Sequence, residues 1–257
     1  MKKIISFAFL LLVLTSCSTK KDILYFQDIK DKPETEIIYT QNKIQVNDNL
    51  MITVTALNPD SALPFNATFY NGAAAGAAAN SQYVMNLNGY LVNADGNISM
   101  PILGNIQVLG KTTNEVEDLI EKILIEQGQL TNPTVMARVT NGKITILGAI
   151  GSPGTYPYLE QNITLLQAIG YAGDLSMAGK RNNILIIREK DGKRTYGNID
   201  MRKTDWFKSE YYYIKPNDII YVYPNGPMVH SAGYISNYTG LISLFFTGLS
   251  IYLLFTK

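Results

Sequence analysis

The sequence is poor in the residues that most enzyme sites require, with one cysteine, one histidine and one tryptophan in 257 residues. One cysteine excludes an intrachain disulfide, and a lone histidine with carboxylates alone is a weak zinc-ligand set. His230 has no carboxylate close to it in sequence and lacks the partners of a nucleophilic site. A glycosidase with paired carboxylates stays open, because spatial pairing is invisible in sequence. We predict no enzyme, no metal site and no cofactor.

Charge is sparse and balanced. Charged residues make up 17% of the chain and the formal net charge is +1. Subtracting Lys2 and Lys3, which lie in a segment predicted to be removed, leaves about −1. Lys and Arg are scattered among Asp and Glu, so we predict no nucleic-acid partner.

The N-terminus, "MKKIISFAFLLLVLTSC", has a short cationic start, an apolar stretch and small residues before Cys17. This layout is typical of a secretory signal and is too short for a spanning helix. Leu14 to Cys17 resemble a bacterial lipobox, which implies a signal peptide over residues 1–16 and a lipid on Cys17. Ser18 follows the pattern of outer-membrane sorting, so we predict a lipid-anchored body facing the periplasm. Residues 17–38 are expected to form a polar tether.

The body predicts an α+β fold. Strands are expected at Leu50 to Val54, Val135 to Val139 and Ile144 to Leu147, and Asp95-Gly96 predicts a hairpin between Leu91-Val92 and Ile98 to Ile102. Capping boxes beginning at Thr112 and Thr164 predict two helices. The segment "NGAAAGAAAN" at 71–80 is low in complexity and predicts no function.

One pattern occurs twice. "IQVNDNLMITV" and "IKPNDIIYVYP" both place an Asn-Asp turn, at 47–48 and at 217–218, before alternating apolar residues. Together they predict a weak internal repeat, although a chance match of two such units is also compatible with the sequence. The tyrosine groups "EYYYI" and "YVYP" could stack on sugars, but half-buried strand faces are the favoured interpretation.

Two blocks resemble bacterial polysaccharide export proteins. "NADGNISMPILGNIQVLGKTTNEVEDLI" is similar to the hallmark of that family, and "ITILGAIGSPGTYPYLEQNITLLQAIGYAGDL" resembles the soluble-ligand-binding β-grasp (SLBB) domain that follows it. The resemblance covers roughly Tyr39 to Pro224. It implies an export domain at 39–140 and one SLBB domain at 141–224, where the best-known members carry more than one. Asn-Asp turns replace the Gly-Asp turns usual in the family.

The same resemblance implies a function. Family members form homo-oligomeric rings in the outer membrane, commonly octamers, through which capsular polysaccharide or exopolysaccharide leaves the cell. They act with an inner-membrane co-polymerase.

Residues 225–257 are expected to form a linker and a C-terminal transmembrane helix, because "GLISLFFTGLSIYLLFTK" has no charge before its last residue. Small and hydroxyl residues recur along one face of this helix and predict a pore-lining or helix-packing stripe, which consists of Ser236, Gly240, Ser243, Thr247 and Ser250. A simple tail anchor on a periplasmic scaffold that binds glycan or a partner is the alternative function. Chance alignment of common small residues is the alternative explanation of the stripe.

Overall fold

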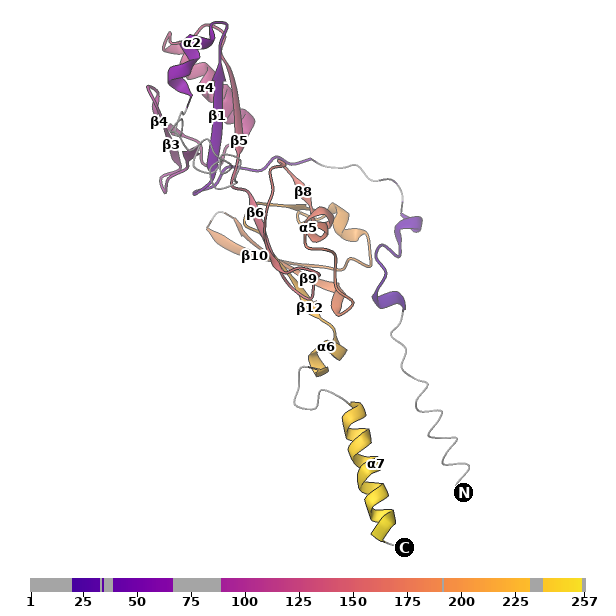
Figure 1. Cartoon of the computed structure of the whole chain (residues 1–257). Helices are drawn as coiled ribbons and strands as arrows, with labels where there is room; N and C mark the ends of the chain where they lie inside the picture. The colour runs from indigo at the N-terminus through magenta and orange to yellow at the C-terminus, as the bar shows by residue number, and fades with distance from the viewer. Residues whose placement is uncertain are drawn as a thin grey trace.

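The protein contains two hydrophobic cores, one on each side of residue 140. The computed structural model describes residues 20–32, 34, 39–66, 89–190, 192–231 and 238–255. One core lies within residues 44–137 and the other within residues 144–222. Figure 1 shows the two corresponding units, with β1 and α4 in one and β6, β9 and α5 in the other. The mixed α and β composition is confirmed, and the domain boundary between 140 and 141 stays a prediction.

The first unit combines a small antiparallel sheet, a separate hairpin and one long helix. Its sheet has the order β2, β1, β5, and β3 pairs with β4. Leu50, Ile52 and Val54 alternate into the core as predicted. The elements are β1 Asn49–Thr55, α2 Pro59–Ala62, η3 Leu63–Phe65, β2 Tyr90–Leu91, β3 Asn97–Met100, β4 Gly104–Gln107, α4 Thr113–Glu126 and β5 Thr134–Val139.

Helix α4 is capped at its start and is held to strand β5 by two side chains. The predicted capping box is confirmed, because Thr112 accepts from the Glu115 amide and the Glu115 carboxylate accepts from the Thr112 amide. Two further carboxylates on α4 accept from outward-facing amides of strand β5. Glu121 accepts from Val135 N at 2.9 Å and Glu117 accepts from Ala137 N at 2.8 Å.

The hairpin predicted around Asp95-Gly96 is wrong in its pairing. Gly96 does form a turn with φ of +80°. However, β2 pairs with β1, and β3 pairs with β4 instead of with β2. The chain reverses at residues 101–103, between β3 and β4, where Ile102 has a φ of +67°. Long-range pairing of Tyr90 with Leu50 therefore prevails over the local turn signal.

The second unit is a mixed five-stranded sheet, with strand order β10, β9, β12, β6, β7, packed with one short helix. Strands β12 and β6 are parallel and the other neighbours are antiparallel. The elements are β6 Lys143–Gly148, β7 Gly154–Pro157, β8 Ile163–Thr164, α5 Leu165–Tyr171, β9 Gly179–Lys190, β10 Lys193–Ile199, η4 Asp205–Lys208, β11 Tyr213–Ile214 and β12 Ile219–Pro224. The SLBB assignment of this unit stays a prediction.

The helix cap and the glycine-rich turn of this unit follow the sequence. Thr164 and Gln167 form the predicted capping box of α5. Gly148 has a φ of +92°, and a Cβ atom there would lie 2.1 Å from the Val222 carbonyl oxygen. The glycine therefore lets β6 approach the backbone of β12, as expected of a tight turn.

Residues 20–32, which we call the N-terminal strap, pack on the second unit, so the expectation of a simple spacer over 17–38 is wrong for this stretch. The strap contains η1 Lys20–Asp22 and η2 Ile29–Asp31 and runs beside that unit in Figure 1. Phe26 donates its amide to the Met201 carbonyl at 3.1 Å and places its ring 5.7 Å from that of Phe207. Apolar residues at 23–26 were the available signal, but strap contacts reach residues about 175 positions away and have no local pattern.

The C-terminal region contains helices α6 Gly226–Ser231 and α7 Tyr238–Phe255. A helix over the apolar tail is confirmed, but the transmembrane prediction is not. Within the described ranges, no helix is both long enough and apolar enough to cross a membrane.

Candidate functional site

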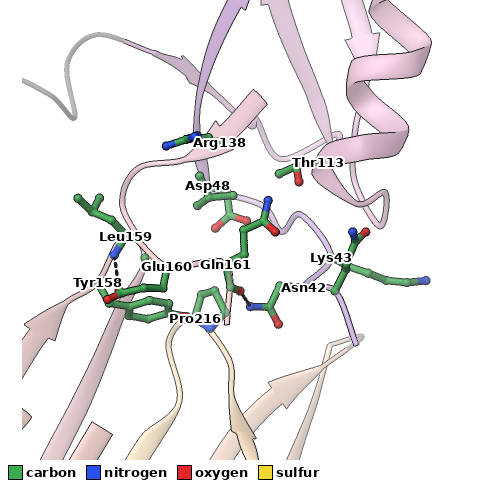
Figure 2. A pocket seen from close by; sticks show the side chains of 13 residues that line it. Asn42, Lys43, Asp48, Thr113, Arg138, Tyr158, Leu159, Glu160, Gln161 and Pro216 are labelled. Atoms are coloured by element: carbon green, nitrogen blue, oxygen red, sulfur yellow. Dashed lines mark hydrogen bonds between the residues drawn. The ribbon is translucent and has the colours of Figure 1, made fainter. Parts of the chain in front are cut away.

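A cavity of about 300 Å³ lies where the two units meet, and Figure 2 shows it closely. Both units supply its walls, through the segment before β1, the ends of α4 and β5, and the 158–161 loop. A direct hydrogen bond crosses the junction, from the Asn42 amide to the Gln161 carbonyl at 2.6 Å. The lining residues are Gln41, Asn42, Lys43, Asp48, Thr113, Arg138, Val139, Gly142, Tyr158, Leu159, Glu160, Gln161 and Pro216.

The first Asn-Asp turn carries the most buried charge of this cavity. Asn47 adopts φ of +69°, a left-handed conformation that Asn tolerates. The chain then folds back so that the Asp48 carboxylate accepts from the Gln45 amide at 2.8 Å. Asp48 is 4% exposed, and burial raises the pKa of its carboxyl to about 6. No cation among the described residues forms an ion pair with it.

The second Asn-Asp turn has the same backbone and a different partner. Asn217 has φ of +66°, and the Asp218 carboxylate accepts from the Lys215 amide at 2.9 Å. Here the guanidinium of Arg188 donates to the carboxylate at 3.0 Å from Nε and 2.7 Å from Nη2. Both side chains are 1% exposed. Burial still raises the pKa of Asp218, although Arg188 opposes that shift.

Arg188 joins several segments of the second unit. It donates from Nη1 to the Glu210 carbonyl at 2.8 Å and from Nη2 to the Tyr213 carbonyl at 2.9 Å. Its guanidinium carbon lies 4.9 Å from the centroid of the Tyr211 ring. This arginine therefore satisfies two backbone carbonyls as well as Asp218, which makes the second turn part of a closed polar network.

Tyr158 lies between the two turns and is 6% exposed. Its hydroxyl is buried and has no hydrogen-bond partner in the part of the chain that the structure describes. The pKa of this hydroxyl is raised mainly by burial and further by the charges of Asp218 and Asp48. The Tyr158 hydroxyl therefore stays neutral and is affected by the charges of both aspartates.

The other charged groups around the cavity are more exposed. Lys43 and Arg138 are both exposed, and neither belongs to an ion pair in the described part of the molecule. Glu160 is engaged by the Tyr171 hydroxyl at 3.1 Å and the Leu159 amide at 3.2 Å. Backbone hydrogen bonds lower its pKa, so this carboxylate stays ionised near neutrality.

The site residues predicted from sequence lie elsewhere. Cys17 and Ser236 fall outside the described residues, as does the low-complexity segment at 71–80. Gly240, Ser243, Thr247 and Ser250 lie on α7, with the last three exposed. Ser243 donates to the Gly240 carbonyl at 2.9 Å, Thr247 to the Ser243 carbonyl at 2.7 Å, and Ser250 to the Thr247 carbonyl at 2.8 Å. These hydroxyls therefore bond along their own helix, which leaves the stripe small and mostly apolar toward a neighbour.

Sequence reasoning missed the cavity. The repeated Asn-Asp turn was the available signal, but the sequence does not reveal that Arg188 reaches only one of the two carboxylates. The sequence also does not reveal that residues 158–161 lie beside the other carboxylate, that of Asp48. The described residues hold no group of three or more His, Cys, Asp or Glu side chains arranged for a metal. What the cavity offers chemically is a buried acceptor beside hydroxyl and amide groups.

The N-terminal signature first indicates a class, that of prokaryotic membrane lipoproteins, in a chain whose described residues form a two-unit α+β body. Residues 1–18, which include Cys17, match the model of the prokaryotic membrane lipoprotein lipid attachment site. Residues 39–140 match the model of the family described as polysaccharide biosynthesis/export protein, at the boundaries that the resemblance predicted.

Named relatives agree with that family. The chain is 29% identical over 153 residues to the EPS I polysaccharide export outer membrane protein EpsA of Ralstonia solanacearum, covering 58% of this chain and 39% of the relative. It is 32% identical over 91 residues to the exopolysaccharide production protein ExoF of Rhizobium meliloti, covering 35% and 21%. It is 25% identical over 124 residues to the capsule polysaccharide export outer membrane protein CtrA of Neisseria meningitidis, covering 48% and 31%.

The chain thus spans about two fifths or less of the length of these relatives. Their names describe export or production of polysaccharide. Together with the lipid attachment site, they support the lipid-anchored outer-membrane location predicted from the sequence.

Proposed function

We propose that this chain is a subunit of an outer-membrane polysaccharide export assembly, a homo-oligomeric ring that conducts capsular polysaccharide or exopolysaccharide out of the cell. The observation that carries the proposal is the export-family domain at 39–140, in a chain that also carries a lipid attachment site. Cys17 holds the lipid, and the body faces the periplasm, where an inner-membrane co-polymerase delivers the polymer.

The strap supports this placement. It begins at Lys20, three residues after Cys17, and three residues of extended chain reach about 10 Å. Lys32 pairs with Asp205 at 2.7 Å, and Arg202 pairs with Asp22 at 3.2 Å, so the strap is attached near both ends to the second unit. A lipid on Cys17 would therefore hold the second unit close to the membrane surface.

Ring assembly assigns a role to α7. Ser243, Thr247 and Ser250 satisfy their hydroxyls within the helix, so copies of α7 are able to approach closely along this face. In this proposal the stripe packs α7 helices around the conduit, or lines it. If the alternative scaffold function holds, the protein instead binds glycan or a partner and the tail is only an anchor.

Electron microscopy of the detergent-extracted lipoprotein tests the ring directly. We expect ring-shaped particles, and we expect the double variant Ser243→Leu/Thr247→Leu to disrupt them and to reduce surface polysaccharide at least tenfold. Ile242→Leu, a volume-conserving change beside the stripe on the same helix, is the matched control and should leave both unchanged. Membrane attachment should persist in all three proteins because the lipid provides it.

Monomeric particles in mild detergent would contradict the ring. Normal surface polysaccharide in the Ser243→Leu/Thr247→Leu variant would return the tail to a simple anchor and favour the scaffold.

A further inference from the structure

The two Asn-Asp turns hold their aspartate carboxylates in the same way, but only one of these carboxylates has a cationic partner among the described residues. In each, the aspartate accepts from the amide three residues earlier, at 2.8 Å for Asp48 and 2.9 Å for Asp218. In the second turn the guanidinium of Arg188 donates to the carboxylate and neutralises its charge. In the first, no ion pair is made by the residues described. The protein therefore displays beside Asp218 the kind of group that Asp48 lacks.

The cavity next to Asp48 is large enough to hold a ligand that carries a cationic group. A volume of about 300 Å³ lies at the lower end of the range for small-molecule sites, roughly 300–1,000 Å³. A buried carboxylate without a cation is costly, and an ammonium or guanidinium brought by a ligand would offset that cost.

The neutral groups of the cavity favour hydroxyls on the same ligand. In Figure 2 the Gln161 side chain extends from the second unit toward Asp48, and Thr113 lies across the same space at the start of α4. Within the described chain, the Gln161 amide and the Thr113 hydroxyl make no side-chain hydrogen bond that would occupy them. An amide and a hydroxyl both donate and accept, as sugar hydroxyls require.

We propose that this cavity binds an amino sugar, with its ammonium group on Asp48 and its hydroxyls on Gln161 and Thr113. The proposal deepens the proposed function and rests on it for the source of the sugar, which is a unit of the transported polymer. Lys43 and Arg138 also line the cavity, but both are exposed and, among the described residues, neither forms an ion pair with Asp48.

The affinity of the cavity for an amino sugar should fall as the pH is lowered from 7 to 5. The groups around Asp48 are Lys43, Arg138, Tyr158 and Glu160, with Asp218 beyond Tyr158. Glu160 has a lowered pKa and Tyr158 a raised one, so neither changes charge between pH 5 and 7. Asp48, with a pKa of about 6, is about 90% protonated at pH 5, and binding of a cation should weaken about tenfold there.

The experiment is ligand-observed NMR on the full-length lipoprotein in detergent, with glucosamine as the probe. N-acetylglucosamine and glucose are matched probes that lack the cation. We expect saturable binding of glucosamine at pH 7, at least tenfold weaker binding of both neutral sugars, and at least tenfold weaker glucosamine binding to Asp48→Asn. Asp60→Asn, the same change at an exposed position outside the cavity, is the control variant and should bind normally. Gln161→Ala should weaken the binding of glucosamine, and of N-acetylglucosamine and glucose as far as they bind.

Three results would overturn the amino-sugar site: no saturable binding, equal binding of the three sugars, or unchanged binding to Asp48→Asn. L-argininamide binding more tightly than glucosamine would assign the cavity to a protein side chain and would also overturn it. Ring formation and surface polysaccharide are measured separately in the same variants. Loss of the sugar site with intact rings would leave the proposed function standing, whereas absence of rings would count against that function alone.

Discussion

The turns at 47–48 and 217–218 share a backbone but differ in what neutralises their aspartates. Both asparagines are left-handed, and both carboxylates are buried. Asp218 lies in a network closed by Arg188, whereas Asp48 opens on a cavity between the two units. A short sequence pattern can therefore fix the geometry of a turn, while the surrounding fold determines whether its aspartate has a partner within the chain or faces a cavity.

The largest effect should follow removal of the cation from the closed turn. Arg188→Met leaves Asp218 buried without its partner and frees the Glu210 and Tyr213 carbonyls, so we expect a loss of about 3–5 kcal/mol in the free energy of unfolding. Trp206, the only tryptophan, is 5% exposed in this unit, so its fluorescence during urea unfolding measures the change. Arg188→Met/Asp218→Asn should recover part of the loss. A loss below about 1 kcal/mol in the single variant would show that the network contributes little.

Replacing the aspartate by asparagine should change the stability of the protein in opposite directions in the two turns. The folded pKa of Asp48, about 6, lies above its ordinary value of 3.8, so its contribution to stability is lost as pH rises from about 4 to 6. Asp48→Asn keeps an acceptor for the Gln45 amide and should stabilise the protein by about 1–3 kcal/mol at pH 7.5, with no gain at pH 3.5. Asp218→Asn should destabilise at pH 7.5, because it leaves Arg188 buried and uncompensated.

Urea unfolding followed by far-ultraviolet circular dichroism at the two pH values measures both variants. Destabilisation by Asp48→Asn at pH 7.5 would mean that this carboxylate already has a compensating partner and that the two turns do not differ as described.

The smallest effect should be shared by both turns. Asn47→Gly and Asn217→Gly each remove the cost of a Cβ atom at positive φ, at the expense of a more flexible unfolded chain. We expect each to change stability by less than about 1 kcal/mol, and by the same amount, because the two backbones match. Thermal unfolding of the two variants side by side measures this. A difference above about 1 kcal/mol between them would separate the turns at the level of the backbone.

Local features of the fold were predictable from sequence and distant ones were not. The capping boxes at Thr112 and Thr164 and the alternation of apolar residues after Asp48 involve neighbours within a few residues. Such patterns can therefore be recognised in the sequence. The pairing of β2 with β1, the docking of Phe26 on Phe207 and the reach of Arg188 to Asp218 join residues far apart, where the chain carries no periodic signal.

For the candidate site, Asp48 was recognised only as part of a turn. It shares its cavity with Tyr158 and Gln161, which come from the other unit. The α7 stripe shows a further limit, since its spacing was visible in sequence but the bonding of its hydroxyls to their own helix depends on rotamers.

The two glutamates that α4 extends to strand β5 bear on whether a further strand can be added to this sheet. Because Glu117 and Glu121 already occupy the outward amides of Ala137 and Val135, this border of the sheet offers few free donors to an incoming strand. Adding a strand at this border would therefore gain little from backbone hydrogen bonds, and any partner that docks there must rely on side-chain contacts.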